Sequence, residues 1–179
     1  MSMIIDGTNG LTFNNATTQN SGGQVLQVVS TTITSIVTTT VSNNSTFYAI
    51  SGLSATITPK FTNSKILVKV NLCGSGSNGY SLVYAVQLQR GTTPIGIGDA
   101  ASGFRQASVG NQRASADSNS VSSIAWNYLD SPATTSATTY QIAVTVEGGN
   151  FVLNTSANNT SGIYASRSAS GITLLEIAG

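Results

Sequence analysis

The chain has 179 residues, a length that suits one domain with a hydrophobic core. Charged residues make up only 7% of the chain and the formal net charge is +1, which excludes the electrostatic footprint of a nucleic-acid-binding protein or of a polybasic membrane site. The sequence has no histidine and one cysteine, so it cannot build a Ser-His-Asp triad, a histidine metal site or an internal disulfide.

Serine, threonine and asparagine take the place of the missing charges, with 26, 24 and 16 residues respectively. A surface of hydroxyls and amides changes little when salt screens charges, and it suits a protein that works in an assembly or outside the cell. The first residues lack the charged start and apolar stretch of a signal peptide, and no run approaches the ~18 apolar residues of a membrane helix. Release by cell lysis would reconcile this surface with the missing export signal.

The first 23 residues differ in composition from the rest of the chain. They are rich in Asn, Thr and Gly and end in Ser-Gly-Gly, which is typical of a flexible joint. We therefore predict an extended N-terminal arm over residues 1–23 and one folded domain over residues 24–179. The few apolar residues of the arm are candidate contacts with a partner; they are Ile4, Ile5, Leu11 and Phe13.

Three runs in the first half of the domain show the period-two alternation of β-strands. The first run, residues 53–57, ends before Pro59. The other two, residues 65–72 and 80–88, flank a Gly-rich segment with the dipeptide Asn78-Gly79, which favours a tight turn. This pattern predicts a β-hairpin over residues 65–90.

Two segments in the middle of the chain lack this alternation. Residues 96–100, Gly-Ile-Gly-Asp-Ala, predict a turn, because a phosphate-binding loop would need a helix to follow it. Residues 100–121 predict a long exposed loop, in which Phe104 and Arg105 are candidate contacts with a neighbour or a receptor. A solvated connection explains the same residues.

The second half of the domain returns to the strand pattern. Residues 124–128, 140–147 and 151–153 are predicted to be strands. Residues 172–177 are almost wholly apolar, which predicts a central strand or a covered edge. Because good helix formers are scarce, these runs predict an all-β fold, a jelly-roll β-sandwich of roughly 8–10 strands.

The acidic residues offer no catalytic pair. A glycosidase needs two facing carboxylates, but Asp130 stands beside Ser-Pro and is typical of a turn, and Glu147 ends a strand before two glycines. Cys73, flanked by apolar residues, is typical of a small buried hydrophobic residue. We predict a protein that is not an enzyme and has no cofactor and no metal site.

Two further patterns are weak. Asn-X-Ser/Thr triplets, such as the one at Asn154, arise by chance in a chain so rich in these residues. Exposed aromatic residues would favour carbohydrate binding, but Trp126 and Tyr128 lie on apolar strand faces that predict core positions. Tyr48 and Tyr164 lie in more polar contexts, and their exposure stays open.

Several segments together resemble small structural proteins from the exterior of tailed bacteriophages. The leader IIDGTNGLTFNNATTQNSGG is similar to one often seen before tail-fibre head domains. The domain that follows is similar in the segments TPKFTNSKILVKVNL, LQRGTTPIGIGD, YLDSPATTSATTYQI and SGITLLEIAG. The resemblance covers nearly the whole chain and implies a trimeric jelly roll of the C1q and tumour-necrosis-factor type, a virion location and no catalysis. A tail fibre usually has a shaft and a large anchor before its head, whereas residues 1–23 alone precede this domain.

Three functions are compatible with these observations, and the first is favoured. Capsid decoration, in which a compact trimer ties neighbouring capsomers together, suits the short polar arm and the charge-poor surface, because three arms on one trimer bind with avidity. A tail-fibre or receptor-binding head suits the leader and the predicted loop over residues 100–121. A secreted lectin-like module suits the aromatic residues but not the missing export signal.

The expected partners follow from these functions. They are two further copies of the chain, the major capsid protein or another virion structural protein and, for a fibre head, a host surface receptor or glycan. We expect neither nucleic acid nor a membrane as a partner, and we place the protein on the outer surface of a virion, after synthesis in the host cytoplasm and release by lysis. Trimer formation would cover the outward-facing Leu175 and Ile177 of the last strand.

Overall fold

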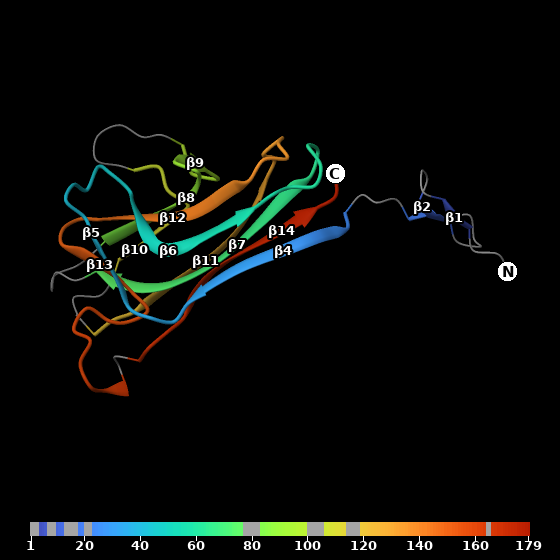
Figure 1. Ribbon diagram of the computed structural model, residues 1–179. Helices are drawn as coiled ribbons and strands as arrows, with labels where there is room; N and C mark the ends of the chain where they lie inside the picture. The colour runs from blue at the N-terminus through green and yellow to red at the C-terminus, as the bar shows by residue number, and fades with distance from the viewer. Residues whose placement is uncertain are drawn as a thin grey trace.

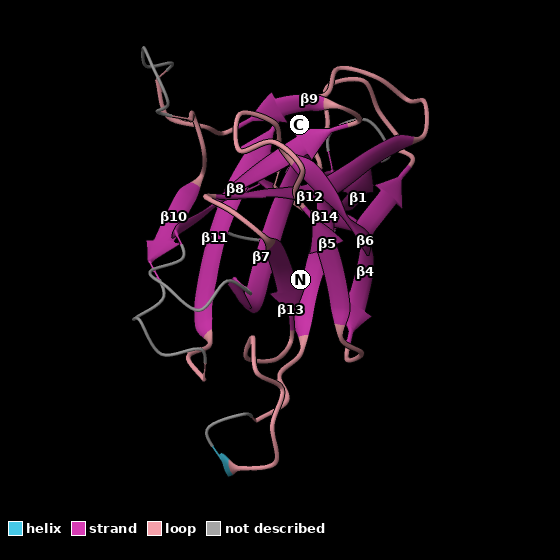
Figure 2. Cartoon of the chain, turned by 90° about the vertical axis from the view of Figure 1, so that its left-hand side faces the viewer, coloured by secondary structure: helices cyan, strands magenta, loops and turns pink. Residues whose placement is uncertain are grey.

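The computed structural model describes residues 4–6, 10–12, 18–19, 23–76, 83–99, 106–113, 119–163 and 166–179. Within these ranges the chain forms β-strands and their connections and no α-helix, and most strands belong to two layers packed face to face (Figures 1 and 2). The strands are β1 (Ile4–Asp6), β2 (Gly10–Thr12), β3 (Thr18–Gln19), β4 (Val25–Ile33), β5 (Val37–Thr40), β6 (Tyr48–Ile57), β7 (Lys65–Gly76), β8 (Val83–Arg90), β9 (Thr93–Ile95), β10 (Gly110–Arg113), β11 (Ser122–Asp130), β12 (Thr138–Val146), β13 (Asn150–Leu153) and β14 (Ser170–Ile177). The predicted all-β sandwich is confirmed.

The two layers have the connectivity of a jelly roll. One layer has the order β4-β14-β7-β11. β11 pairs with one edge of β7, and the opposite edge of β7 pairs with β14 over its first part and with β13 over its last residues. The other layer has the order β6-β12-β8-β10. Counted in chain order, these eight strands pair first with eighth, second with seventh, third with sixth and fourth with fifth, as in a long hairpin rolled across two sheets. The short strands β5, β9 and β13 extend the layers.

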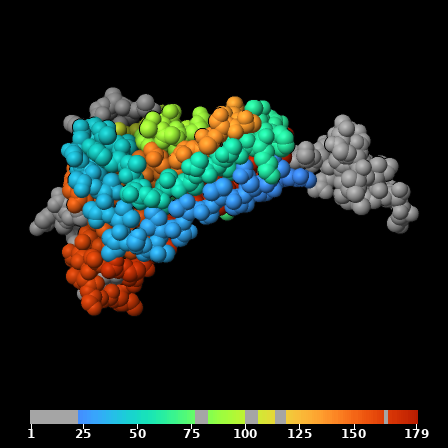
Figure 3. Space-filling model, in the orientation of Figure 1, coloured from blue at the N-terminus to red at the C-terminus, as the bar shows by residue number. Residues whose placement is uncertain are grey.

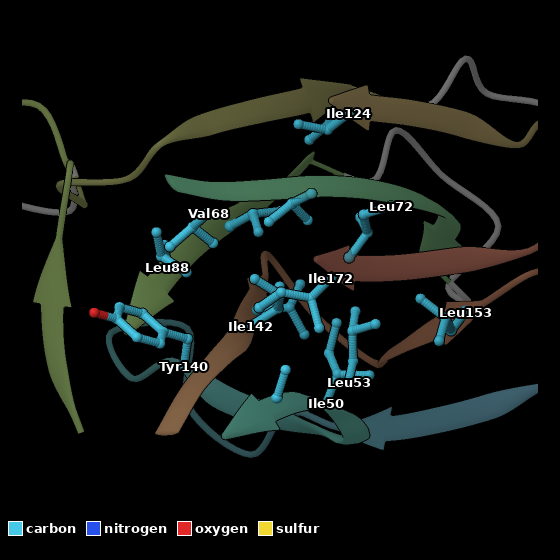
Figure 4. Close-up of a cluster of buried hydrophobic side chains, with 14 of the residues drawn as sticks. Ile50, Leu53, Val68, Leu72, Leu88, Ile124, Tyr140, Ile142, Leu153 and Ile172 are labelled. Carbon is cyan, nitrogen blue, oxygen red and sulfur yellow. The ribbon is translucent and has the colours of Figure 1, made fainter. Parts of the chain in front are cut away.

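The core lies between the layers, where the alternating apolar residues of each strand point inward (Figure 4). Ile66, Val68 and Leu72 of β7 are fully buried, as are the residues that face them from the other layer. The ring centroids of Tyr84 and Phe151 lie 5.1 Å apart. Because a slip of one residue would turn every inward side chain to the surface, this alternation fixes the register of the strands.

The hairpin predicted over residues 65–90 is wrong. β7 and β8 lie in different layers, since β7 pairs with β11, β13 and β14 whereas β8 pairs with β9, β10 and β12. Both strands turn an alternating apolar face to the same core, so the period-two pattern cannot distinguish a neighbour in the sheet from a strand across the sandwich. The residues that connect them, 77–82, lie outside the described residues.

The predicted loop over residues 100–121 is a loop only in part. Residues 110–113 form β10, which pairs with β8. Before it, residues 106–109 lie half-buried on β8, where the backbone N–H of Val109 donates to the carbonyl oxygen of Val86 at 2.8 Å. The sequence Gly-Asn-Gln-Arg of this edge strand has no apolar alternation, which explains why it escaped prediction. Phe104 and Arg105 lie outside the described residues.

The segment predicted as an extended arm contains paired strands. β1, β2 and β3 form a three-stranded antiparallel sheet in which Ile5 lies opposite Leu11 and Leu11 opposite Gln19. In Figure 1 the strands β1 and β2 stand beyond the end of the sandwich at which β4 begins. Phe13 falls outside the described ranges, and the role of the segment stays a prediction.

Candidate functional site

A row of aliphatic side chains crosses the outer face of the β4-β14-β7-β11 layer. In the register of the sheet, Val28 lies opposite Leu175, Leu175 opposite Leu67, and Leu67 opposite Leu129. Directly opposed residues point to the same face of a sheet, so the four side chains form one strip, here called the aliphatic row. Val28 and Leu129, at its two ends, are 58% and 55% exposed.

Val25 and Ile177 widen this strip toward the end of the layer. An irregularity after Glu176 shifts the register so that Ile177 lies opposite Val25, which is 52% exposed. The outward orientation of Leu175 and Ile177 was expected from the sequence, and both are half-buried between fully or nearly buried neighbours. A contiguous aliphatic strip at the surface is a candidate site for the packing of another molecule.

A buried carboxylate holds the end of the layer that carries this strip. Glu176 of β14 is fully buried, and its Oε1 accepts hydrogen bonds from the Ser64 hydroxyl and the Lys60 backbone N–H, both at 2.7 Å. Its Oε2 accepts a hydrogen bond from Gln27 Nε2 of β4 at 2.6 Å. Burial alone would raise the pKa of the Glu176 carboxyl, but these hydrogen bonds outweigh it and the pKa lies below its ordinary value. The ionised carboxylate therefore fixes residues 58–64 and β4 against β14.

The outer face of the other layer is polar. The hydroxyls of Thr56 and Thr139 lie 2.8 Å apart across β6 and β12. Beside them, Gln141 Nε2 donates to Gln89 Oε1 at 3.0 Å, and Gln89 Nε2 donates to Gln87 Oε1 at 3.3 Å. Gln87 Nε2 in turn donates to the Ala107 carbonyl oxygen at 2.7 Å. These side chains form hydrogen bonds with one another and with the backbone, so this face needs no partner to cover it.

An ion pair joins the two layers at one end of the sandwich. Arg90 Nη1, at the end of β8, donates to both carboxylate oxygens of Asp130 at 3.1 and 2.9 Å, and the Tyr140 hydroxyl donates to Asp130 Oδ2 at 2.6 Å. Burial, helped by this hydrogen bond, raises the pKa of Tyr140 far above its ordinary value. The prediction that Asp130 forms a turn is wrong, because its side chain is buried between strands and its partner Arg90 is distant in sequence.

Cys73 and Asn154 also have surroundings that the sequence did not reveal. Cys73 lies half-exposed on the outer face of β7, with its Sγ 3.0 Å from the hydroxyl of Ser123, so the predicted buried position is wrong. Asn154 is fully buried with a φ of 66°, and its Nδ2 donates to the carbonyl oxygens of Ile33 and Ser35. Its amide closes the junction between strands and cannot carry a glycan in this fold.

The predicted contact residues lie apart from the aliphatic row. Ile4 and Ile5 belong to β1 and Leu11 to β2, whereas Phe13, Phe104 and Arg105 lie outside the described ranges. Val28, Leu67 and Leu129 were missed as surface residues for two reasons. Val28 and Leu129 lie outside the predicted strand runs, and the run over residues 65–72 was interpreted only through its inward apolar face. The signal was present in β7, where Leu67 falls between the inward-facing Ile66 and Val68.

Groups that could bind a metal do not gather in the described ranges. No set of three or more Cys, Asp or Glu side chains there could hold a metal ion. In the same ranges, no helix has the length and apolar character needed to cross a membrane.

No family model and no curated protein matches this chain. Among solved structures, the chain is similar to that of the infectious bursal disease virus Gx strain, with a TM-score of 0.41, 12% sequence identity, and coverage of 86% of this chain and 42% of that one. For the infectious bursal disease virus Gt strain the TM-score is 0.41, the identity 13% and the coverage 91% and 39%. For the VP2 subviral particle of infectious bursal disease virus the TM-score is 0.35, the identity 13%, and the coverage 91% of this chain and 43% of that one. The chain thus spans about two fifths of those proteins, and its assignment as a jelly roll rests on its own strand pairing.

Proposed function

We propose that this chain is a non-enzymatic structural protein on the exterior of a bacteriophage particle, where it forms homotrimers that decorate the capsid. The observation that carries the proposal is the aliphatic row, with Val25 and Ile177 beside it. The resemblance of the leader and of four later segments to phage exterior proteins supports the virion location. The charge-poor surface and the absence of histidine agree with a role in assembly and not in catalysis.

The energetics favour use of the whole strip. Burial of one aliphatic side chain contributes roughly 1.5–3 kcal/mol, whereas association costs about 4–15 kcal/mol in lost freedom of motion. Several of these side chains must therefore be covered together for copies of the chain to associate stably. A three-fold trimer provides this when the three copies of the strip meet around the rotation axis and cover one another there.

The place where residue 23 leaves the sandwich supports a role for residues 1–23 in docking. The Gly23 backbone N–H donates to the carbonyl oxygen of Ala178 at 3.0 Å, so the chain enters the domain beside the end of β14, where Val25 and Ile177 lie. Copies that meet through this strip would gather their three N-terminal segments at one end of the trimer. Three weak contacts with capsid subunits would then act together with high avidity.

Two experiments test the proposal. Light scattering of the purified protein should give a mass three times that of the 18.3 kDa chain. Immunogold electron microscopy of particles, with antibody against this protein, should label the whole capsid surface. A monomer mass at micromolar concentration contradicts the trimer, and particles without label contradict the virion location.

A tail-fibre or receptor-binding head is the second candidate, and one observation favours it. The connection between β13 and β14 projects from the sandwich (Figures 2 and 3), and Ile163 in it is 92% exposed. An apolar side chain on a projecting loop suits contact with a receptor. Immunogold label confined to the tail, together with specific adsorption of the purified protein to host cells, would support this function over decoration.

A further inference from the structure

We infer that the outer face of the β4-β14-β7-β11 layer holds a binding site for acidic saccharides next to the aliphatic row. A hollow of about 480 Å³ lies on this face, and its lining includes Thr32, Lys69, Asn71, Ala125, Asn127 and Thr173. The inference goes beyond the proposed structural role, because assembly by itself requires no ligand.

The hollow arises from small residues set among longer polar ones. In the register of the sheet, Gly171 lies opposite Asn71, and Asn71 opposite Ala125. Gly171 has no side chain to fill this space, and a Cβ there would stand 3.1 Å from the carbonyl oxygen of Thr31 on the neighbouring strand. The next register row, toward the aliphatic row, places Thr173 opposite Lys69 and Lys69 opposite Asn127. Small residues thus form the floor, and longer polar residues stand beside it.

Charge is the first feature that selects the ligand. The side chain of Lys69 is exposed, and its ammonium group makes no hydrogen bond or ion pair with any other residue in the part of the chain that the structure describes. None of the residues that line the hollow is acidic. The Lys69 ammonium group is therefore available to an anionic group of a ligand. Charge-assisted hydrogen bonds of this kind are about twice as strong as hydrogen bonds between neutral groups.

The remaining lining selects a ligand rich in hydroxyl groups. Asn71 and Asn127 each provide an amide that donates and accepts, and Thr32 provides a hydroxyl that does both. The Thr173 hydroxyl already lies 2.8 Å from the Ser30 hydroxyl and keeps part of its hydrogen-bonding capacity for a ligand. One ammonium group matches one carboxylate better than a doubly charged phosphate. A sugar carboxylate on Lys69 with its neighbouring hydroxyls on the amides satisfies all of these groups. The hollow is open to the surface, so it admits an inner segment of a polysaccharide such as those of bacterial envelopes.

The chain offers a matched pair of variants for the test. Lys69→Gln removes the charge at the hollow and keeps the length of the side chain. Lys65→Gln makes the same change on the same face of the same strand, but Lys65 donates to the Ser131 hydroxyl at 2.8 Å and does not line the hollow. The probe is a tetrasaccharide that contains glucuronic acid, titrated into the full chain and followed by NMR. A neutral glucose tetrasaccharide is the comparison.

The expected result is that the unmodified chain and Lys65→Gln bind the acidic tetrasaccharide equally, and that Lys69→Gln binds it about tenfold more weakly, as for loss of one charge-assisted hydrogen bond. Ala125→Leu, which fills the floor from an exposed position, should weaken binding without loss of folding. Equal binding by Lys69→Gln, no binding to the unmodified chain at millimolar ligand, or full competition by inorganic sulfate would overturn the inference. Light scattering reports separately on the trimer, so failure of one proposal is distinguishable from failure of the other.

Discussion

The two outer faces of the sandwich are built on the same strand alternation but meet water differently. The β6-β12-β8-β10 layer presents threonine hydroxyls and glutamine amides that bind one another, whereas the β4-β14-β7-β11 layer presents the aliphatic row. Both layers bury equivalent apolar sets on their inner faces. The inward residues therefore specify the fold, and the outward residues, free of that constraint, can specify a partner. This difference is open to direct tests.

The largest effect is expected from a charge in the aliphatic row. Leu67→Asp leaves the inner face of β7 unchanged and puts a carboxylate at the centre of the strip, where burial of an unpaired charge is costly. We expect complete conversion of the proposed trimer to a folded monomer, measured by light scattering. Thr139→Asp, on the polar face, is the control and should leave the mass unchanged. A trimer of Leu67→Asp would show that copies meet elsewhere.

A smaller effect, on stability, is expected at the carboxylate under the strip. Glu176→Gln places an amide NH₂ among groups that donate hydrogen bonds, and should lower the free energy of unfolding by about 3 kcal/mol. The native pKa lies below the ordinary value of 4.5, so the stabilisation is present above that pH and is lost as pH falls through the native pKa. Urea unfolding as a function of pH measures both effects.

The exposed Glu147 provides the control for this prediction. Glu147→Gln should leave the unfolding free energy within about 0.5 kcal/mol of the unmodified value at every pH. Loss of the acid dependence in Glu176→Gln, and its retention in Glu147→Gln, would assign the effect to the buried group. An identical acid dependence in both variants would contradict that assignment.

The ion pair between the layers should contribute less. Tyr140→Phe removes one hydrogen bond to Asp130, and we expect a loss of about 1–1.5 kcal/mol in the free energy of unfolding. Tyr48→Phe is the control, because the Tyr48 hydroxyl forms no hydrogen bond with other described residues. Equal stabilities of the two variants would show that the buried hydrogen bond adds nothing.

Alkaline unfolding tests the buried tyrosines independently. Burial raises the pKa of Tyr84 to about 12 from an ordinary 10, so the fold favours the neutral phenol. This stabilisation is present below pH 10 and is lost as pH rises toward 12. Ultraviolet absorbance of the phenolate should show Tyr84 ionising together with unfolding. Ionisation of all tyrosines near pH 10 in the folded protein would contradict the expectation.

The smallest effect is expected on the polar face. Thr56→Val removes one partner of the hydroxyl pair with Thr139, at a site open to water. Because water replaces the lost hydrogen bond, we expect a change within about 0.5 kcal/mol in the free energy of unfolding and no effect on the mass of the proposed trimer. Dissociation of the proposed trimer in this variant would contradict the expectation that only the face with the aliphatic row takes part in association.

The fold was predictable from the sequence to the extent that strand alternation determines it. The alternation placed Ile66, Val68 and Leu72 in the core and identified β7, β11, β12 and β14 as strands. Strand partners were not predictable, because β7 and β8 carry the same pattern and yet belong to different layers. The short strand β10 escaped because an edge strand with polar residues has no periodic signal.

The candidate site was predictable only in part. Leu175 and Ile177 were identified as outward-facing because the last strand is apolar on both faces. Val28, Leu67 and Leu129 come from three other strands, and only the register brings them beside Leu175. The surroundings of Asp130 and Glu176 were missed for the same reason, since their partners lie on distant segments of the chain.

The hydrogen bonds that close the sandwich beside residue 23 have a practical consequence for peptide display. Gly23 pairs with Ala178, and Asn63 Nδ2 donates to the Gly179 carbonyl oxygen at 3.0 Å, so residues 23 and 179 share one pole of the domain. A peptide fused after Gly179 would emerge beside Gly23 and, under the proposed docking of residues 1–23, would compete with their partner. An epitope inserted near Ile163 would instead stand on the projecting loop, away from that pole (Figure 1). The loop, rather than the chain end, is the position for cargo intended to face outward.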